Sequence, residues 1–101
     1  MLESLFGNKS AEKVMCSLFF HEEIHASLIA KNYQTAIDPI KKQLEKFETS
    51  GILESRVVGR SKLYRFNEQH PIVPHLKNLI EAAHLAERKQ NNKNEFSISS
   101  H

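Results

Sequence analysis

Apolar residues in the first half of the chain recur at helical spacing. Early in the chain, positions three or four residues apart share one face of a helix: Ala11, Val14, Met15, Leu18 and Phe19. A shorter helix is predicted over residues 26–33, and a third over residues 35–50, where Ile40, Leu44 and Phe47 share a face. We expect these three apolar faces to pack together as a small core.

The start of the third helix fits two capping arrangements. Thr35 can cap it with Asp38 as the acidic third residue, in a variant of the capping box. Alternatively, Asp38 caps it and Pro39 takes the first helical position, where its missing N–H costs no hydrogen bond. Both arrangements tolerate the proline. Gly51 is expected to end the helix in the left-handed conformation.

After the third helix the pattern changes to short runs of β-branched and aromatic residues. Residues 52–58 and 62–66 are such runs, and Gly59 between them permits a tight hairpin turn. Two helices joined by a short turn near residues 32–34 and followed by a hairpin are in the order of a winged helix-turn-helix. We therefore predict a mainly α fold with a small β-hairpin (α+β), in which residues 52–66 form the wing.

A final helix is predicted over residues 71–88, opening at Pro71 or Pro74. Its apolar residues at helical spacing are Ile72, Leu76, Leu79, Ile80 and Ala83. A chain of 101 residues forms one small domain. Because such a domain buries little apolar area, we expect this stripe to form the interface of a homodimer. We thus predict a winged helix-turn-helix domain over residues 1–88 and a disordered polar tail over residues 89–101.

Positive charge is concentrated on the third helix and the hairpin. Between Lys31 and Arg65, eight Lys and Arg stand against four Asp and Glu, a net charge of +4 in a chain whose total is +2. DNA is a dense polyanion, and neutralising its phosphates supplies most of the non-specific binding energy. The pattern therefore predicts double-stranded DNA as a partner, with the third helix as the recognition helix in the major groove.

Candidate DNA contacts divide between the recognition helix and the wing. The lysines of the helix can reach phosphates or guanine acceptors, and Gln43 can read adenine if it is rotated far enough. Arg60 at the hairpin tip suits minor-groove or backbone contact, whereas Arg65 can instead pair with Glu54 across the hairpin. The candidate residues are Gln34, Thr35, Asp38, Lys41, Lys42, Gln43, Lys46, Arg56, Arg60 and Lys62.

Residues 21–25 read HEEIH and match the HExxH motif of zinc proteases. That chemistry requires both histidines on one face of a continuous helix, together with a third ligand and a substrate cleft. Here His21 and His25 fall between two predicted helices, in an expected turn. We therefore expect no catalytic residues, no metal, no cofactor and no enzymatic activity.

The remaining features favour a cytoplasmic protein without a membrane partner. Cys16 is the only cysteine, so no intrachain disulfide can form, and a reducing compartment is expected. Cys16 itself is expected to be a buried or half-buried hydrophobic residue. The N-terminus lacks the pattern of a signal peptide, and no apolar run approaches the roughly 20 residues of a membrane span.

The stretch IKKQLEKFETSGILESRVVGRSKLYRFN resembles the winged helix-turn-helix of ArsR-like bacterial transcriptional regulators. In that group a helix of the form xLxxLexaGll precedes xxrxxgrxxxYxl. The matching positions are Leu44, Phe47, Glu48, Gly51, Ile52, Leu53, Arg56, Gly59, Arg60 and Tyr64. The resemblance extends loosely over residues 5–88 and implies a homodimer that binds a pseudo-palindromic operator and often represses its own operon.

The chain departs from the metal-sensing members of that group. It has no cysteine-containing box at the recognition helix, and His75, Glu81 and His84 do not form a convincing ligand set. No metal or small-molecule effector is therefore indicated. An alternative function is a winged-helix module for protein interaction, or a toxin–antitoxin-type accessory module, without direct DNA readout. Salt-dependent binding of a generic duplex separates the two.

Overall fold

The computed structural model describes the backbone of residues 6–99 and the side chains of residues 6–88. The two ends of the chain, residues 1–5 and 100–101, lie outside the described residues, and so do the parts of the predicted domain and tail that fall on them. The elements in order are α2 (Lys9–Phe20), β1 (Ile24–His25), α3 (Ala26–Asn32), α4 (Ile37–Thr49), β2 (Leu53–Val58), β3 (Ser61–Phe66) and α5 (Val73–Ser99).

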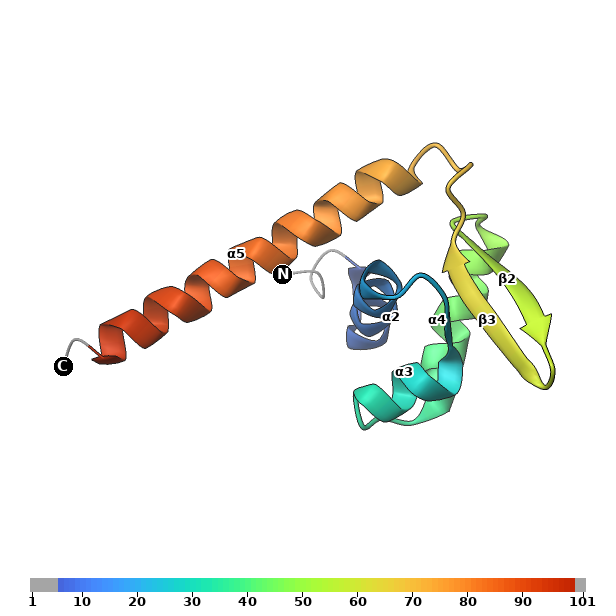
Figure 1. Ribbon diagram of the computed structural model, residues 1–101, viewed down its shortest axis with the longest axis horizontal. Coiled ribbons are helices and arrows are strands. Elements are labelled where there is room, and N and C mark those ends of the chain that lie inside the picture. The colour runs from blue at the N-terminus through green and yellow to red at the C-terminus, as the bar shows by residue number, and fades with distance from the viewer. Residues whose placement is uncertain (1–5, 100–101) are drawn as a thin grey trace.

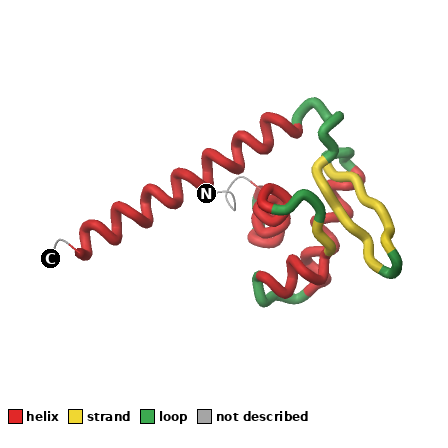
Figure 2. Tube along the Cα trace, viewed as in Figure 1, coloured by secondary structure: helices red, strands yellow, loops and turns green. Residues whose placement is uncertain are grey.

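Three short helices form the body of the molecule. Figure 1 shows α2, α3 and α4 grouped together, the β2–β3 hairpin extending from one side, and α5 as a long helix that projects past the body. A loop between the end of β3 and the start of α5 reverses the chain, and Figure 2 shows it beside the foot of the hairpin. Among the described residues, no helix is long and apolar enough to cross a membrane.

The core lies where α2, α3 and α4 meet. Met15 of α2, Ile29 of α3 and both Ile40 and Leu44 of α4 are fully buried. Full burial of one such side chain stabilises the fold by about 1.5–3 kcal/mol relative to its exposure. The helical faces predicted from the sequence are therefore confirmed, and they place the opposite face of α4 outward.

The start of α4 differs from both arrangements expected from the sequence. The helix begins at Ile37 with Ala36 as its N-cap, and no side chain caps it. Thr35 and Asp38 therefore make neither of the expected caps. Pro39 is the third residue of the helix, and it is tolerated there because the N–H groups of the first turn have no partner within a helix.

The turn between α3 and α4 is closed by the backbone rather than by a capping side chain. The N–H of Thr35 donates to the carbonyl of Ala30 at 3.0 Å. Gln34 has a φ of +54°, in the left-handed region that side chains other than glycine seldom adopt. After α4, Gly51 has a φ of +87°, which confirms its predicted role at the end of the helix.

The sheet has three antiparallel strands, in the order β1-β3-β2, where the sequence predicts two. The hairpin pairs Leu53 with Phe66 at its foot and Val58 with Ser61 at its tip, as expected. The additional strand β1 has only two residues, which is too short for alternation to show in the sequence. It joins the wing to the body, because Ile24 is buried in the core while pairing with Tyr64 of β3.

The last helix is longer than expected. The sequence predicts a helix that ends near residue 88 and a disordered tail over residues 89–101, whereas α5 continues to Ser99. Neither proline nor glycine occurs from residue 75 to residue 99, so nothing in the chain interrupts the helix. Val73, Ile80 and Ala83 of α5 are buried in the core, which attaches the first part of this helix to the body.

Candidate nucleic-acid interface

The outward face of α4 carries three lysines. Ile40 and Leu44 point into the core, and Lys41, Lys42 and Lys46 are exposed on other sides of the same helix. Among the described residues, none of the three lysines pairs with a carboxylate. Their charges are therefore available to an anionic ligand, as the sequence predicts for a recognition helix.

The other candidates near α4 are less uniformly placed. Gln34 is exposed in the turn before the helix, Asp38 is exposed in its first turn, and Thr35 is half-buried. Gln43 is also half-buried, and its Oε1 atom is buried without a hydrogen-bond partner among the residues described. The adenine contact expected for Gln43 needs its side-chain amide outside, so this geometry does not favour that role.

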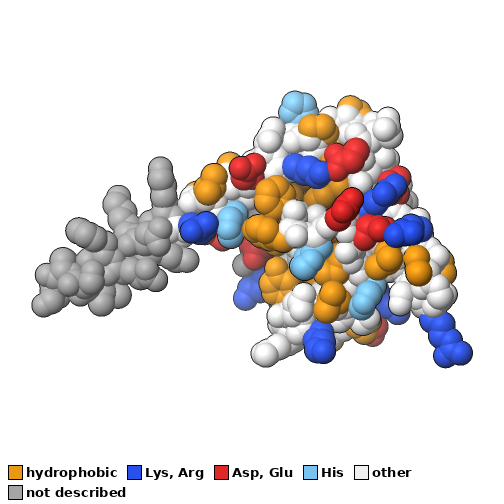
Figure 3. Space-filling model, viewed as in Figure 1, with side chains coloured by type: hydrophobic (Ala, Val, Ile, Leu, Met, Phe, Trp, Pro, Cys, Tyr) orange, Lys and Arg blue, Asp and Glu red, His pale blue; other side chains and the backbone are white. Residues whose placement is uncertain are grey.

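We call the β2–β3 hairpin the wing, and the turn at its tip carries a cation. Arg60 lies in the turn between the strands, is exposed, and has no carboxylate partner among the described residues. Figure 3 shows Lys and Arg side chains over the hairpin, one of which extends beyond the rest of the surface at the hairpin end. Val57 and Val58 next to the tip are 72% and 48% exposed.

Arg56, a predicted DNA contact, forms an ion pair within the protein instead. Its Nε and terminal nitrogen donate to the two carboxylate oxygens of Glu23 at 2.7 and 2.6 Å. The hydrogen bonds from Arg56 hold the pKa of Glu23 below its usual value. This bidentate contact joins β2 to the loop before β1, so Arg56 acts as a tether between the wing and the body.

Lys62, also a predicted DNA contact, joins the wing to α4. Its Nζ lies 3.1 Å from Oε1 of Glu48, which raises the pKa of Lys62. The Ser55 hydroxyl of β2 donates to the other oxygen of Glu48, and this bond is the main reason that the pKa of Glu48 is lowered. Glu48 therefore holds both strands of the wing from the end of α4.

Sequence reasoning assigned no role to Glu48, although the residue belongs to the ArsR-like motif. Its partners lie on two different strands, so its function depends on how the hairpin docks on α4. The same reasoning did anticipate Arg65, whose Nε donates to Glu54 at 2.7 Å across the hairpin, where the two residues are directly paired.

A hollow of about 330 Å³ lies between α4 and the wing. Its lining comes from α4, the wing and the start of α3: His25, Ala26, Ser27, Ile37, Lys41, Glu45, Arg60, Ser61, Lys62 and Tyr64. We call it the α4–wing hollow. Because Lys41 and Arg60 line the same hollow, the recognition helix and the wing tip flank one side of the molecule. The two parts of the predicted interface are thus brought together.

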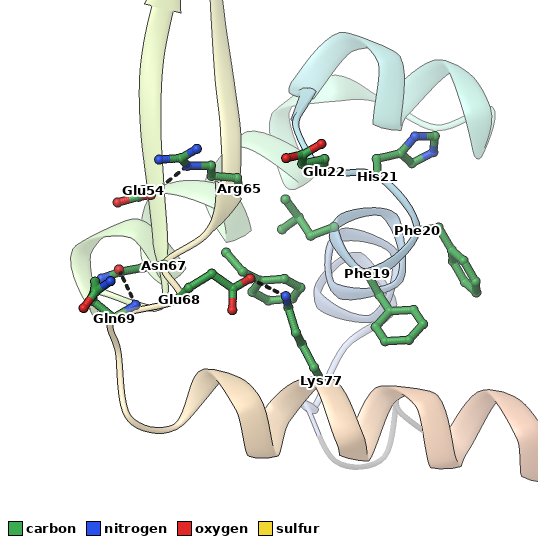
Figure 4. Close-up of a pocket in the computed structure, with 12 residues that line it drawn as sticks. Phe19, Phe20, His21, Glu22, Glu54, Arg65, Asn67, Glu68, Gln69 and Lys77 are labelled. Carbon is green, nitrogen blue, oxygen red and sulfur yellow. Dashed lines mark hydrogen bonds and ion pairs between the residues drawn. The ribbon is translucent and has the colours of Figure 1, made fainter.

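A second, larger cavity of about 600 Å³ lies between the end of α2, the foot of the wing and α5 (Figure 4). Arg65 pairs with Glu54 and Lys77 pairs with Glu68 along its walls, while Phe19 contributes an aromatic ring. The cations of this cavity are therefore already neutralised. It shares no lining residue with the α4–wing hollow.

The HEEIH segment does not have the geometry of a zinc protease. His21 lies in the loop after α2, whereas His25 is in β1 and caps α3, its Nδ1 accepting the N–H of Leu28 at 3.1 Å. The two histidines thus do not share one continuous helix, which agrees with the expectation from the sequence that they lie between two helices. Within the described part of the chain, no group of three or more His, Cys, Asp or Glu side chains lies close enough to hold a metal ion.

Cys16 on α2 is half-buried, as expected from its place in an apolar segment. Burial is the main cause that raises the pKa of its thiol to about 11. The thiol therefore stays protonated at neutral pH, and a protonated thiol is a poor nucleophile and metal ligand.

The predicted dimer stripe on α5 divides into an inner and an outer part. Ile80 and Ala83 are 0% and 1% exposed within the chain's own core, so the prediction that they contact a partner is wrong for this conformation. The reason is that α5 packs against α2. Leu76 is half-buried, whereas Ile72 and Leu79 remain 51% and 42% exposed.

The sequence matches no protein-family model, and no curated protein is significantly similar to it. Solved structures are similar in fold. The AntR antimony-specific transcriptional repressor has a TM-score of 0.67 at 14% identity, over 80% of this chain and 68% of that one. The chain folds as a winged helix-turn-helix.

Two further structures have the same fold. Reduced HlyU from Vibrio cholerae has a TM-score of 0.65 at 15% identity, over 84% of this chain and 83% of its own. A MarR family transcriptional regulator from Silicibacter pomeroyi has a TM-score of 0.66 at 13% identity, over 87% of this chain. This winged helix-turn-helix chain spans only 62% of the length of that regulator.

Proposed function

We propose that this protein is a sequence-specific DNA-binding transcriptional regulator without catalytic activity. In this proposal α4 enters the major groove and the wing contacts the flanking DNA. The observation that carries it is the α4–wing hollow, since Lys41 and Arg60 flank one surface and neither has a carboxylate partner within the described part of the chain. Fold relatives described as transcriptional regulators support the same function. Such a protein would act in the cytoplasm, with the bacterial chromosome.

We further propose a homodimer that represses by covering its operator. Ile72 lies in the turn directly before α5 and Leu79 lies on α5, and both are exposed, so they offer an apolar stripe at the start of this helix. Pairing two copies through this stripe would give a pseudo-palindromic site with half-sites about one DNA turn, roughly 34 Å, apart. The fold relatives do not single out an ArsR-like subtype, because a MarR family regulator and the AntR repressor match this chain with similar TM-scores. The ArsR-like subtype is therefore proposed on the motif from Leu44 to Tyr64.

The decisive experiment is selection of bound duplexes from random DNA, followed by affinity measurements over a range of salt concentrations. We expect enrichment of one motif with two half-sites. The variant carrying Lys42→Ala and Lys46→Ala should bind more weakly. Its plot of log affinity against log salt should be shallower by about 0.9 for each phosphate that the variant no longer neutralises.

Arg88→Ala is a matched control, because it removes an exposed charge from α5 rather than from α4. This control should leave both affinity and salt slope close to those of the wild type. If the double variant keeps the wild-type slope, the lysine face of α4 does not contact DNA. If no duplex is enriched at low salt, the proposed function is wrong.

One observation favours the alternative function as a protein-interaction module. Because the strand order is β1-β3-β2, β2 is an edge strand, and Val57 on it is 72% exposed. Edge strands with exposed apolar side chains can pair with a strand of another protein. This alternative predicts that the wild-type protein has no affinity for a duplex even at low salt. It also predicts that Val57→Lys abolishes binding of the partner protein.

A further inference from the structure

We propose that Asp38 and Glu45 make α4 selective for cytosine, because their carboxylates accept hydrogen bonds from the exocyclic amino group that cytosine presents in the major groove. This inference rests on the proposed function and deepens it, since it names a base that the bound DNA must contain. It also gives a role to Glu45, which is absent from the DNA contacts predicted from the sequence.

The two carboxylates lie on one line along the exposed side of α4. Asp38 and Glu45 are both exposed, and they are seven residues apart within the helix. Seven residues separate them by about 10 Å along the helix axis and by about 20° around it. Glu45 is turned about 140° from Ile40 and about 100° from Leu44, the two residues of α4 that are buried in the core. The line of carboxylates therefore faces away from the body of the protein.

Lysines lie on both sides of this line. Around the helix, Lys41 is about 40° from Glu45 in one direction and Lys42 is about 60° from it in the other. The major groove has base edges as its floor and phosphates along both walls. A helix that enters the groove with its lysines toward the walls points the line between them at the floor. The side chains that meet the base edges are then Asp38 and Glu45.

The carboxylates of α4 and the wing divide into a paired and an unpaired set. Glu48 and Glu54 each pair with a cation of the wing, so these two hold the hairpin in place. By contrast, Asp38 and Glu45 pair with no cation among the residues that the structure describes, although lysines lie three and four positions away from both. Their oxygens are therefore available to donors of a ligand.

The chemistry of the base edges decides which base a carboxylate accepts. An ionised carboxylate can only accept hydrogen bonds. In the major groove cytosine presents an amino donor, whereas guanine and thymine present acceptor oxygens, and adenine presents an acceptor beside its donor. An acceptor opposite a carboxylate places two negative atoms together with no proton between them. Selectivity therefore comes as much from rejection of the other bases as from the hydrogen bond to cytosine.

The test repeats the duplex selection with Glu45→Gln, which keeps the size of the side chain and removes its charge. The wild type should select a C·G pair at the position that Glu45 contacts. Glu45→Gln should select adenine there instead, because glutamine binds both the N6 and the N7 groups of adenine. Replacing that C·G pair should weaken wild-type binding roughly 5- to 150-fold, the usual effect of one mismatched base pair.

Asp38→Asn should change a different position of the same half-site. The two carboxylates are about 10 Å apart along the helix, which exceeds the roughly 3.4 Å between neighbouring base pairs. Asparagine, like glutamine, reads adenine, so the expected change is again from cytosine to adenine. Selection of the wild-type motif by either variant would overturn the inference for the residue concerned.

Glu45→Ala separates base reading from folding. It should tolerate every base pair at that position and bind a duplex of unrelated sequence more tightly than the wild type does, because a negative charge near the phosphates is removed. Its thermal midpoint should stay close to that of the wild type, since the side chain is exposed. A purely structural role of Glu45 would instead lower the midpoint and leave the selected base unchanged.

Glu22→Gln is the matched control, because it removes an exposed carboxylate from the loop before β1 rather than from α4. This control should select the same motif as the wild type. A wild-type motif without a fixed C·G pair would overturn this inference and leave the proposed function standing. Failure to enrich any duplex would overturn both.

Discussion

Glu48 shows how a single side chain sets the geometry of the proposed binding surface. From the last turn of α4 it accepts hydrogen bonds from Ser55 of β2 and Lys62 of β3. The contact with Lys62 is exposed and the one with Ser55 is only partly buried, so their contribution to stability is modest. Their effect on geometry is larger, because they fix the wing relative to the recognition helix. Arg56 and Glu23 hold β2 to the loop before β1.

Glu48→Gln should loosen the wing and weaken duplex binding severalfold, with little loss of stability at neutral pH. The lowered pKa of Glu48 also gives a pH signature. A carboxylate with a lower pKa in the folded state stabilises the fold above its unfolded pKa of about 4.3, and this stabilisation is lost as pH falls through the folded pKa. The measurement is the thermal midpoint of wild type and variant between pH 7 and pH 2.

We expect a small difference between the two midpoints at pH 7, and this difference should vanish in acid once the pH falls below the lowered pKa of Glu48. Glu54→Gln is the matched control, since Glu54 pairs with Arg65 across the hairpin and not with α4. The control should keep wild-type affinity for the duplex. Equal reductions of affinity in the two variants would show that Glu48 does not position the wing.

At the scale of elements, α3 depends on a histidine for its start. His25 pairs with Leu63 of β3 and caps α3 through Nδ1, so one residue ends β1 and begins the first helix of the helix-turn-helix. A cap of this kind satisfies a backbone N–H that the helix leaves without a partner. This double role gives His25 a structural function that needs no metal.

His25→Ala should lower the free energy of unfolding by about 0.5–2 kcal/mol, the usual cost of removing an N-cap. His25→Asn should recover most of the loss, because asparagine is a good capping residue. His21→Ala should change stability by less than about 0.5 kcal/mol, since His21 is exposed in the preceding loop. Urea unfolding of the three variants measures these differences, and equal effects of the two alanine substitutions would rule out the capping role.

At the scale of the whole molecule, α5 links the body that carries the proposed DNA-binding surface to the proposed dimer. Its inner face, which includes Ile80, is in the core, and its neighbouring side exposes Leu79. The helix then continues past the body to Ser99 (Figure 1). A helix that extends beyond the body of its own chain is marginal in water, so a partner that packs along it would stabilise it.

Leu79→Glu should convert the proposed dimer into a monomer and reduce affinity for the two-half-site duplex. A buried charge at an apolar interface is costly unless it is paired. Leu85→Glu is the matched control, because Leu85 is similarly exposed but lies six residues further on, about 120° around the helix. Sedimentation of both variants decides the matter, and a dimer that survives Leu79→Glu would exclude this stripe as the interface.

The elements that the sequence predicts correctly are those with local signals. Ile40, Leu44 and Phe47 repeat at helical spacing, and Gly51 follows them with a positive φ. The hairpin was predictable because β-branched and aromatic runs surround Gly59. The strand β1 was not, since two residues carry no periodicity. Arg56 and Lys62 were correctly placed on the wing, but their carboxylate partners could not be found in the sequence alone.

The amino-acid sequence by itself determined the order of the helices and of the two hairpin strands, the core face of α4 and the local excess of positive charge. These properties depend on residues a few positions apart, and periodicity and composition report them directly. Only the tertiary structure decided which cations are paired, that Ile80 faces inward, and that Lys41 and Arg60 flank one hollow. Those facts depend on packing between elements far apart in the chain, where small differences in docking change which side chains meet.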